Sequence, residues 1–192
     1  MTNLNILWDF DGTIFNTYPA YTKIFKKVLN NDSITYEEAY KNLKISISYA
    51  CDYYRLSDTQ IREYKSLVEN ISPQEMKPFD HVEDVLKTAN KNVIMTHKDR
   101  ESVHKILAYY GWETYFTDMV AGDDGFPRKP DKSSYEYLHK DHELDLAIGD
   151  RELDIIPANE IGIATCLFQN ENSQLADYYL DDYKAFWETV RL

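Results

Sequence analysis

From residue 79 onward, short apolar segments alternate with segments that have the apolar spacing of amphipathic helices. The apolar segments have the length and composition of buried strands, and they cover residues 93–95, 119–121, 144–148 and, as the last strand, 163–168. Helical spacing occurs between them, at 82–89, 103–107, 133–139 and 155–161, with a terminal helix from about residue 182. Strands separated by helices predict a parallel sheet that has helices on both faces.

One more strand is expected before this pattern begins, over Leu4–Trp8. The segment that follows it is helical in character, at 18–29 and throughout 36–70, and it interrupts the strand–helix alternation. We therefore predict an α/β protein with two parts. Residues 1–15 and 79–192 form a Rossmann-like three-layer core with a parallel sheet, and residues 16–78 form a small all-helical cap inserted after the first strand.

The composition narrows the possible partners. With 192 residues and 43% hydrophobic content, the chain is large and apolar enough for a packed core. Its net charge of −12 argues against nucleic acid and anionic membranes, which bind clustered Lys and Arg. Cys51 and Cys166 show no zinc or disulfide spacing, and nothing near the N-terminus resembles a signal peptide. We expect a cytoplasmic monomer or homodimer.

The polar segment Asp9-Phe10-Asp11-Gly12-Thr13 directly follows the first expected strand. Residues two apart that leave a strand point the same way, so Asp9 and Asp11 are expected to share a site. Different environments can push the pKa values of two such carboxyl groups apart, which leaves one as a nucleophile and the other as a proton donor. Gly12 permits the tight backbone that brings amides near an anion. A simple Asp-Gly turn is the alternative.

Two further polar segments, Thr96-His97 and Lys129-Pro130, are expected at strand ends, where open parallel sheets bind ligands. The Thr96 hydroxyl and the His97 amide can bind a phosphoryl oxygen. Equally, Thr96 can cap the helix that begins near residue 99. Lys129 before Pro130 can stabilise negative charge at the start of a helix; its neighbour Arg128 is an alternative, and both can be solvated cations.

The last polar cluster is Gly149-Asp150, which closes an apolar segment, together with Asp154. On the first turn of a helix this spacing puts both carboxylates on one face. Carboxylate oxygens are the hard ligands that Mg²⁺ prefers, although the two residues can also simply cap the helix. Four such clusters in this order are hard to reconcile with coincidence.

Together these clusters resemble the motifs of the haloacid dehalogenase superfamily of phosphohydrolases. Asp9–Thr13 matches the first motif, Thr96 the second, Lys129 the third and Gly149–Asp154 the fourth. The resemblance covers nearly the whole chain, including a helical cap after the first motif, as in phosphoglycolate phosphatase-like members. One departure is His97, where members often have a small residue or Asn; its side chain is expected to face solvent, with only its amide in use.

The resemblance implies that Asp9 attacks phosphorus to form an aspartyl-phosphate. Asp11 would protonate the leaving oxygen and then activate the hydrolytic water. Mg²⁺ would be held by the carboxylates of Asp9 and Asp150 and the main-chain carbonyl of Asp11, with Asp154 supporting these ligands. The residues that would contact the phosphoryl group are Thr96 and Lys129, with Gly12, Thr13 and His97.

The implied function is magnesium-dependent hydrolysis of a small phosphorylated metabolite, such as phosphoglycolate, a sugar phosphate or a nucleotide. Asp11 argues against a dehalogenase, which needs no acid for a halide leaving group. A phosphomutase of the β-phosphoglucomutase type shares the four motifs and stays open as an alternative. A non-catalytic phosphate- or partner-binding protein is the alternative from another class.

Overall fold

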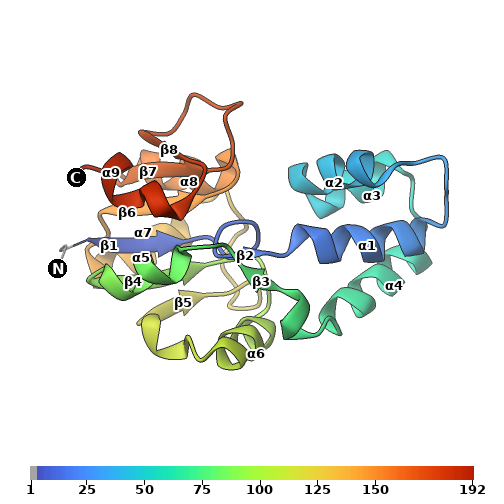
Figure 1. Cartoon of the computed structure of the whole chain (residues 1–192), viewed down its shortest axis with the longest axis horizontal. Coiled ribbons are helices and arrows are strands. Elements are labelled where there is room, and N and C mark those ends of the chain that lie inside the picture. Colours follow the sequence, from blue (N-terminus) through green and yellow to red (C-terminus); the bar gives the residue numbers. More distant parts are fainter. Residues whose placement is uncertain (1–3) are drawn as a thin grey trace. The chain divides into compact units, whose positions relative to one another are not determined.

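The structure is a computed structural model that describes residues 4–192. The chain divides into two compact units (Figure 1): one comprises Met1–Phe15 with Pro78–Leu192, and the other comprises Asn16–Lys77. Residues 1–3, which the predicted core includes, lie outside the described residues. Two short paired strands, β2 (Phe15–Asn16) and β3 (Lys77–Pro78), lie at the two points where the chain passes between the units.

The first unit contains a six-stranded sheet with the order β5-β4-β1-β6-β7-β8, and every neighbouring pair is parallel. Its strands are β1 (Asn5–Trp8), β4 (Lys91–Met95), β5 (Asp118–Val120), β6 (Leu146–Gly149), β7 (Ala164–Phe168) and β8 (Tyr178–Leu180). The predicted α/β class with a parallel sheet is therefore confirmed. The expectation that 163–168 is the last strand is wrong, because the short, partly exposed edge strand β8 follows it.

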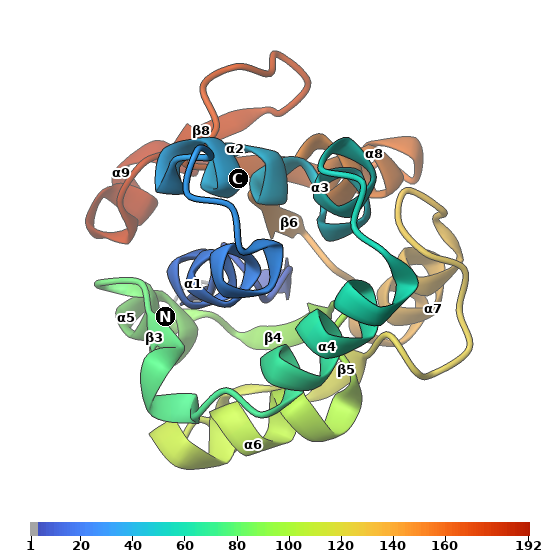
Figure 2. The same cartoon turned by 90° about the vertical axis from the view of Figure 1, so that its right-hand side faces the viewer.

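Helices cover both faces of this sheet (Figure 2), with α7 and α8 on one face and α5 and α9 on the other. Their bounds are α5 (Val82–Thr88), α6 (Arg100–Tyr110), α7 (Ser133–His142), α8 (Glu152–Glu160) and α9 (Phe186–Thr189), with 3₁₀ turns at Glu113–Tyr115 and Tyr183–Ala185. The ends of α6 follow local sequence rules. The Asp99 side chain accepts a hydrogen bond from the Ser102 amide, and Gly111 ends the helix in a left-handed conformation.

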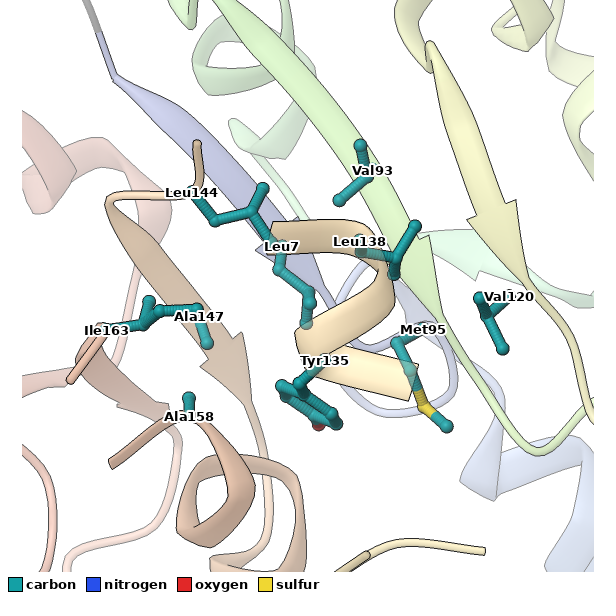
Figure 3. Packing of buried hydrophobic residues seen from close by; sticks show 10 residues of the cluster. All are labelled: Leu7, Val93, Met95, Val120, Tyr135, Leu138, Leu144, Ala147, Ala158 and Ile163. Atoms are coloured by element: carbon teal, nitrogen blue, oxygen red, sulfur yellow. The ribbon is translucent and has the colours of Figure 1, made fainter. Parts of the chain in front are cut away.

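The core under α7 packs against β1 and its two neighbouring strands (Figure 3). Side chains alternate between the two faces of a strand, so Leu7 points towards α7 while Trp8 points to the opposite face. Leu7 packs with Val93 and Ala147 of the neighbouring strands beneath Leu138 of α7. Burying each such aliphatic side chain contributes roughly 1.5–3 kcal/mol to the stability of the folded state. This packing therefore stabilises the relative positions of the three central strands.

The second unit contains the helices α1 (Tyr18–Leu29), α2 (Tyr36–Ile45), α3 (Ile47–Tyr53) and α4 (Asp58–Glu69), followed by a 3₁₀ turn at Pro73–Glu75. The prediction of helix throughout 36–70 is wrong, because two serine residues start new helices within this range. The Ser46 hydroxyl accepts from the Tyr49 amide at the start of α3, and Ser57 forms a capping box with Gln60 at the start of α4.

Two further observations concern the described residues. Both cysteines, Cys51 and Cys166, are buried and unpaired with one another. Within residues 4–192, every helix is too short or too polar to cross a bilayer.

Candidate active site

Three of the four predicted polar clusters lie at the carboxyl ends of adjacent strands in the middle of the sheet. Asp9 follows β1, Thr96 follows β4 and Asp150 follows β6. The fourth, Lys129, was expected at a strand end but lies on the loop between β5 and α7. The Lys129–Pro130 pair also does not open a helix, because α7 begins only at Ser133. Tertiary contacts therefore bring Lys129 to the other clusters.

Lys129 lies at the centre of the site and joins two carboxylates. Its Nζ atom is 2.7 Å from Asp9 Oδ1 and 2.8 Å from Asp154 Oδ1. All three side chains are buried, and that of Lys129 is fully inaccessible to solvent. Charge-assisted hydrogen bonds of this length fix the relative positions of their groups. The alternative residue Arg128 is exposed, and its guanidinium contacts His97.

A possible cation site lies beside this lysine. Asp9, Asp150 and Asp154 are all buried, and each offers one carboxylate oxygen that lies within 4.8 Å of the other two. The positive groups next to them are Lys129 and Arg151, whose Nε atom is 3.6 Å from Asp150 Oδ1. Hard oxygen ligands and an excess of negative charge are the chemistry that suits a divalent cation such as Mg²⁺. The residues present therefore fit a magnesium ion.

The pKa values of these groups reflect their burial and mutual repulsion. Burial, together with the Asp154 carboxylate, raises the pKa of Asp9 to about 7, and Lys129 only partly opposes this. Burial alone would lower the pKa of Lys129, but Asp154 and Asp9 outweigh burial and raise it. For Asp154, burial acts upward on the pKa, yet the cations Lys129 and Arg151 hold it below its usual value. A cation bound here would favour ionised Asp9.

Asp154 uses both of its carboxylate oxygens to hold neighbouring groups. Oδ1 accepts from Lys129, and Oδ2 accepts from the Arg151 amide at 3.1 Å, at the start of α8. Gly149 permits this close packing, because a Cβ atom on Gly149 would lie 2.2 Å from Asp154 Cβ. Asp154 is thus placed to support the site while also capping a helix.

The loop after β1 orients Asp9 from its other side. The Thr13 hydroxyl donates to Asp9 Oδ2 at 3.1 Å, and the Thr13 carbonyl accepts a buried hydrogen bond of 2.9 Å from the Tyr183 hydroxyl. Gly12 has a φ angle of 88°, and its N–H donates to the Phe15 carbonyl at 2.8 Å. That amide is engaged inside the turn, so the predicted contact of Gly12 with a phosphoryl oxygen would require this bond to break.

Asp11 lies outside the group of three clustered carboxylates. Its carboxylate instead meets Lys98, whose Nζ atom is 3.4 Å from Oδ1 and 3.5 Å from Oδ2. The Lys98 side chain is 8% exposed and that of Asp11 is 20% exposed. No role for Lys98 was predicted, although its position directly after the Thr96-His97 pair was a signal that it lies close to the site.

The segment after β4 carries Thr96 and His97. Thr96 is buried, and its hydroxyl accepts from the Lys98 amide at 3.1 Å, which leaves its own proton to donate. The expectation that the His97 side chain faces solvent is wrong. Its Nε2 atom accepts a hydrogen bond of 2.9 Å from the main-chain N–H of Lys129. Burial, with the nearby charges of Lys129 and Arg128, lowers the pKa of His97 to about 3.

A fixed lysine, a buried carboxylate and clustered hard oxygens are suited to reactions of phosphate groups. The chain is also similar to known proteins. Residues 6–168 match the family model described as haloacid dehalogenase-like hydrolase. The phosphoglycolate phosphatase of Vibrio vulnificus (strain CMCP6) is 25% identical over 122 residues, which form 57% of this chain and 54% of that protein. The chain thus spans about half the length of the curated relatives it matches.

Solved structures show the same fold. A hydrolase from Streptococcus pneumoniae TIGR4 is 27% identical, with a TM-score of 0.66 over 89% of this chain and 95% of that one. A predicted phosphoglycolate phosphatase from Haemophilus somnus 129PT has a TM-score of 0.75, with 98% of each chain covered and 20% identity. The likeness to the second structure concerns the fold alone.

Proposed function

The chain belongs to the haloacid dehalogenase-like hydrolases, and from this premise we propose that it is a magnesium-dependent phosphomonoester hydrolase that acts through an aspartyl-phosphate. The observation that carries this proposal is the pair of bonds from Lys129 to Asp9 and Asp154 beside three clustered carboxylate oxygens. A buried lysine held in this way can neutralise charge on an attacking carboxylate and on a phosphoryl group. Catalysis of phosphoryl transfer depends mainly on such electrostatic stabilisation and on the positioning of the reacting groups.

In the first step, a carboxylate oxygen of Asp9 forms a bond to phosphorus while the ester P–O bond breaks. Asp11 donates a proton to the leaving oxygen, so that the alcohol departs neutral. In the second step, Asp11 accepts a proton from water, which attacks phosphorus, releases phosphate and regenerates Asp9. The hydrogen bonds from Thr13 and Lys129 to the two oxygens of Asp9 support its role as the attacking group, because they fix the carboxylate in one orientation.

Mg²⁺ would be held by the carboxylates of Asp9 and Asp150 and by the main-chain carbonyl of Asp11. When bound, it supplies positive charge that reduces the repulsion between the nucleophile and the phosphoryl oxygens. Asp154 would support these ligands without coordinating the ion itself, since its two carboxylate oxygens already accept hydrogen bonds from Lys129 and Arg151. The burial of the three carboxylates supports this assignment, because buried charges need a partner.

The phosphoryl group would be contacted by Thr96 and Lys129, with the Thr13 and His97 amides as further donors. The unit Asn16–Lys77 would act as a cap that admits only small substrates. We propose a small phosphorylated metabolite of the phosphoglycolate, sugar phosphate or nucleotide class. The phosphoglycolate phosphatase from Vibrio vulnificus makes phosphoglycolate the first compound to test.

The test is phosphate release from a panel of small phosphate esters, with Mg²⁺ and with excess chelator, using wild type and Asp9→Asn. Release that requires both Mg²⁺ and Asp9 is the expected result. Unchanged rates in chelator would remove the metal from the mechanism, and no release from any ester would contradict the hydrolase. Conversion of a sugar phosphate into an isomer without phosphate release would identify a phosphomutase instead.

A further inference from the structure

We propose that His97 is a positioning residue that sets the place of Lys129 by accepting a hydrogen bond from its main-chain N–H. This inference rests on the proposed function, in which Lys129 contacts the phosphoryl group. The bond joins Lys129 N to His97 Nε2 over 2.9 Å. It connects the end of β4 with the loop between β5 and α7, and Lys129 lies outside every helix and strand of the described residues.

His97 is itself held firmly, so it can act as an anchor. Gly122, just after β5, packs directly on its backbone: a Cβ atom there would lie 2.2 Å from the His97 carbonyl oxygen. The Gly122 N–H donates to the Lys98 carbonyl at 2.8 Å, and the Lys98 N–H donates to the Thr96 hydroxyl at 3.1 Å. These contacts fix the backbone on both sides of His97, from which the imidazole extends to the Lys129 amide.

The bond also defines the chemical state of the imidazole. A main-chain N–H can only donate, so Nε2 must carry a lone pair and the proton of the neutral ring must reside on Nδ1. An imidazolium would have no acceptor to offer. The Nη2 atom of the exposed Arg128 lies 3.0 Å from Nδ1; because both nitrogens carry protons in this tautomer, this contact is not a hydrogen bond and does not hold the ring. The lowered pKa of His97, near 3, is consistent with a neutral acceptor at the pH of the cell.

Losing this acceptor has two effects on the lysine. The buried Lys129 amide would be left without its partner, and the loop would lose the contact that places the lysine backbone. The Nζ atom must stay within hydrogen-bond distance of both Asp9 and Asp154, and a displacement of about 1 Å in a catalytic group can cost 10²-fold in rate. Because Lys129 acts on charge that develops during reaction, kcat is expected to fall more than KM rises.

The hydrogen bond can be observed directly in the full-length protein by NMR. A correlation through the hydrogen bond between the ¹⁵N nuclei of the Lys129 amide and His97 Nε2 is expected, together with the Nδ1–H tautomer in the ring nitrogen shifts. This measurement requires no substrate. Absence of the correlation, with a Lys129 amide that exchanges rapidly with solvent, would overturn the proposal even if the protein is a phosphatase.

The kinetic test compares His97→Ala with His97→Gln, because the glutamine amide can place an acceptor oxygen near the position of Nε2. We expect kcat for phosphate release to fall about 10- to 100-fold in His97→Ala and to return to within a few-fold of wild type in His97→Gln. His104→Ala, an exposed histidine on α6, is the control and should match wild type. Circular dichroism and thermal melting check that the variants fold.

Two outcomes count against His97. One is a folded His97→Ala variant within twofold of the wild-type kcat, and the other is a His97→Gln variant no better than His97→Ala. Failure of the proposed function looks different. In that case wild type itself releases no phosphate from any ester, and the NMR correlation alone decides whether His97 holds Lys129.

Discussion

Lys129 Nζ lies 2.7 Å from Asp9 Oδ1, and both side chains are buried. The first prediction tests this pair. Asp9→Asn keeps the shape of the side chain but removes the attacking oxygen, so kcat should fall by about 10⁴-fold or more. Lys129 keeps Asp154 as a partner, and the fold should survive. Phosphate release and circular dichroism measure the two effects; more than a tenth of the wild-type rate would exclude Asp9 as the nucleophile.

The second prediction concerns Asp11, which lies outside the carboxylate cluster. Asp11→Asn cannot activate the water that hydrolyses the aspartyl-phosphate, so the phosphoenzyme should accumulate after substrate is mixed with protein and Mg²⁺. Intact-mass spectrometry of the rapidly quenched reaction detects the phosphoryl adduct. A protein of unmodified mass that turns over at nearly the normal rate would rule out this role.

The third prediction tests the contact of Lys98 with Asp11, 3.4 Å apart and largely shielded from water. Lys98→Met removes the cation beside Asp11, the proposed acid and base. The value of kcat should fall about tenfold, which corresponds to about 1.4 kcal/mol in activation free energy. Lys98→Arg keeps the charge and should retain most of the activity. Equal rates for both variants and wild type would show that this ion pair does not contribute to the reaction.

The fourth prediction follows from the packing of Gly149 on Asp154. In Gly149→Ala the new methyl group would lie 2.2 Å from Asp154 Cβ, so Asp154 must move, and with it the lysine that it holds. Overpacking of this kind costs about 1–3 kcal/mol, and activity should fall as well. Gly162→Ala is the control, because its φ of +79° strains the backbone but its Cβ meets no atom. If both variants keep full kcat, Asp154 does not require this placement.

The fifth prediction concerns pH and metal binding. Without metal, the pKa of Asp9 is raised to about 7 by burial and Asp154, so below pH 7 a proton occupies the carboxylate that Mg²⁺ needs. Affinity for Mg²⁺ should therefore weaken as the pH falls through 7, approaching tenfold per pH unit, with a proton released on binding at pH 6 and little released at pH 8. Calorimetry in two buffers of different ionisation enthalpy measures this. Affinity that is constant from pH 6 to 8 would contradict the linkage.

The sequence predicted the parallel sheet and three of the four cluster positions because buried strands are short apolar segments with sharp ends. Asp9, Thr96 and Asp150 each follow such a segment directly. These features depend on residues close together in the chain.

What could not be predicted depends on tertiary contacts. His97 meets an amide 32 positions later, so no pattern around it reveals its direction. Tyr183 contacts Thr13 from the opposite end of the chain and carries no local signal. The edge strand β8 is short and partly exposed, with none of the apolar length that marks the central strands. Ser46 resembles any polar residue on a helix surface, so the sequence did not indicate that it caps the start of α3.

Asp9 and Lys129 are 120 positions apart in the chain, and this separation affects when the site can form during synthesis. Non-local pairings of this kind form late, because the entropy of closing so long a loop must be overcome first. During synthesis on the ribosome, the loop that carries Lys129 and the strand that leads to Asp150 emerge long after Asp9. Catalytic competence should therefore arise only once most of the polypeptide has been made, and truncated nascent chains should be inert.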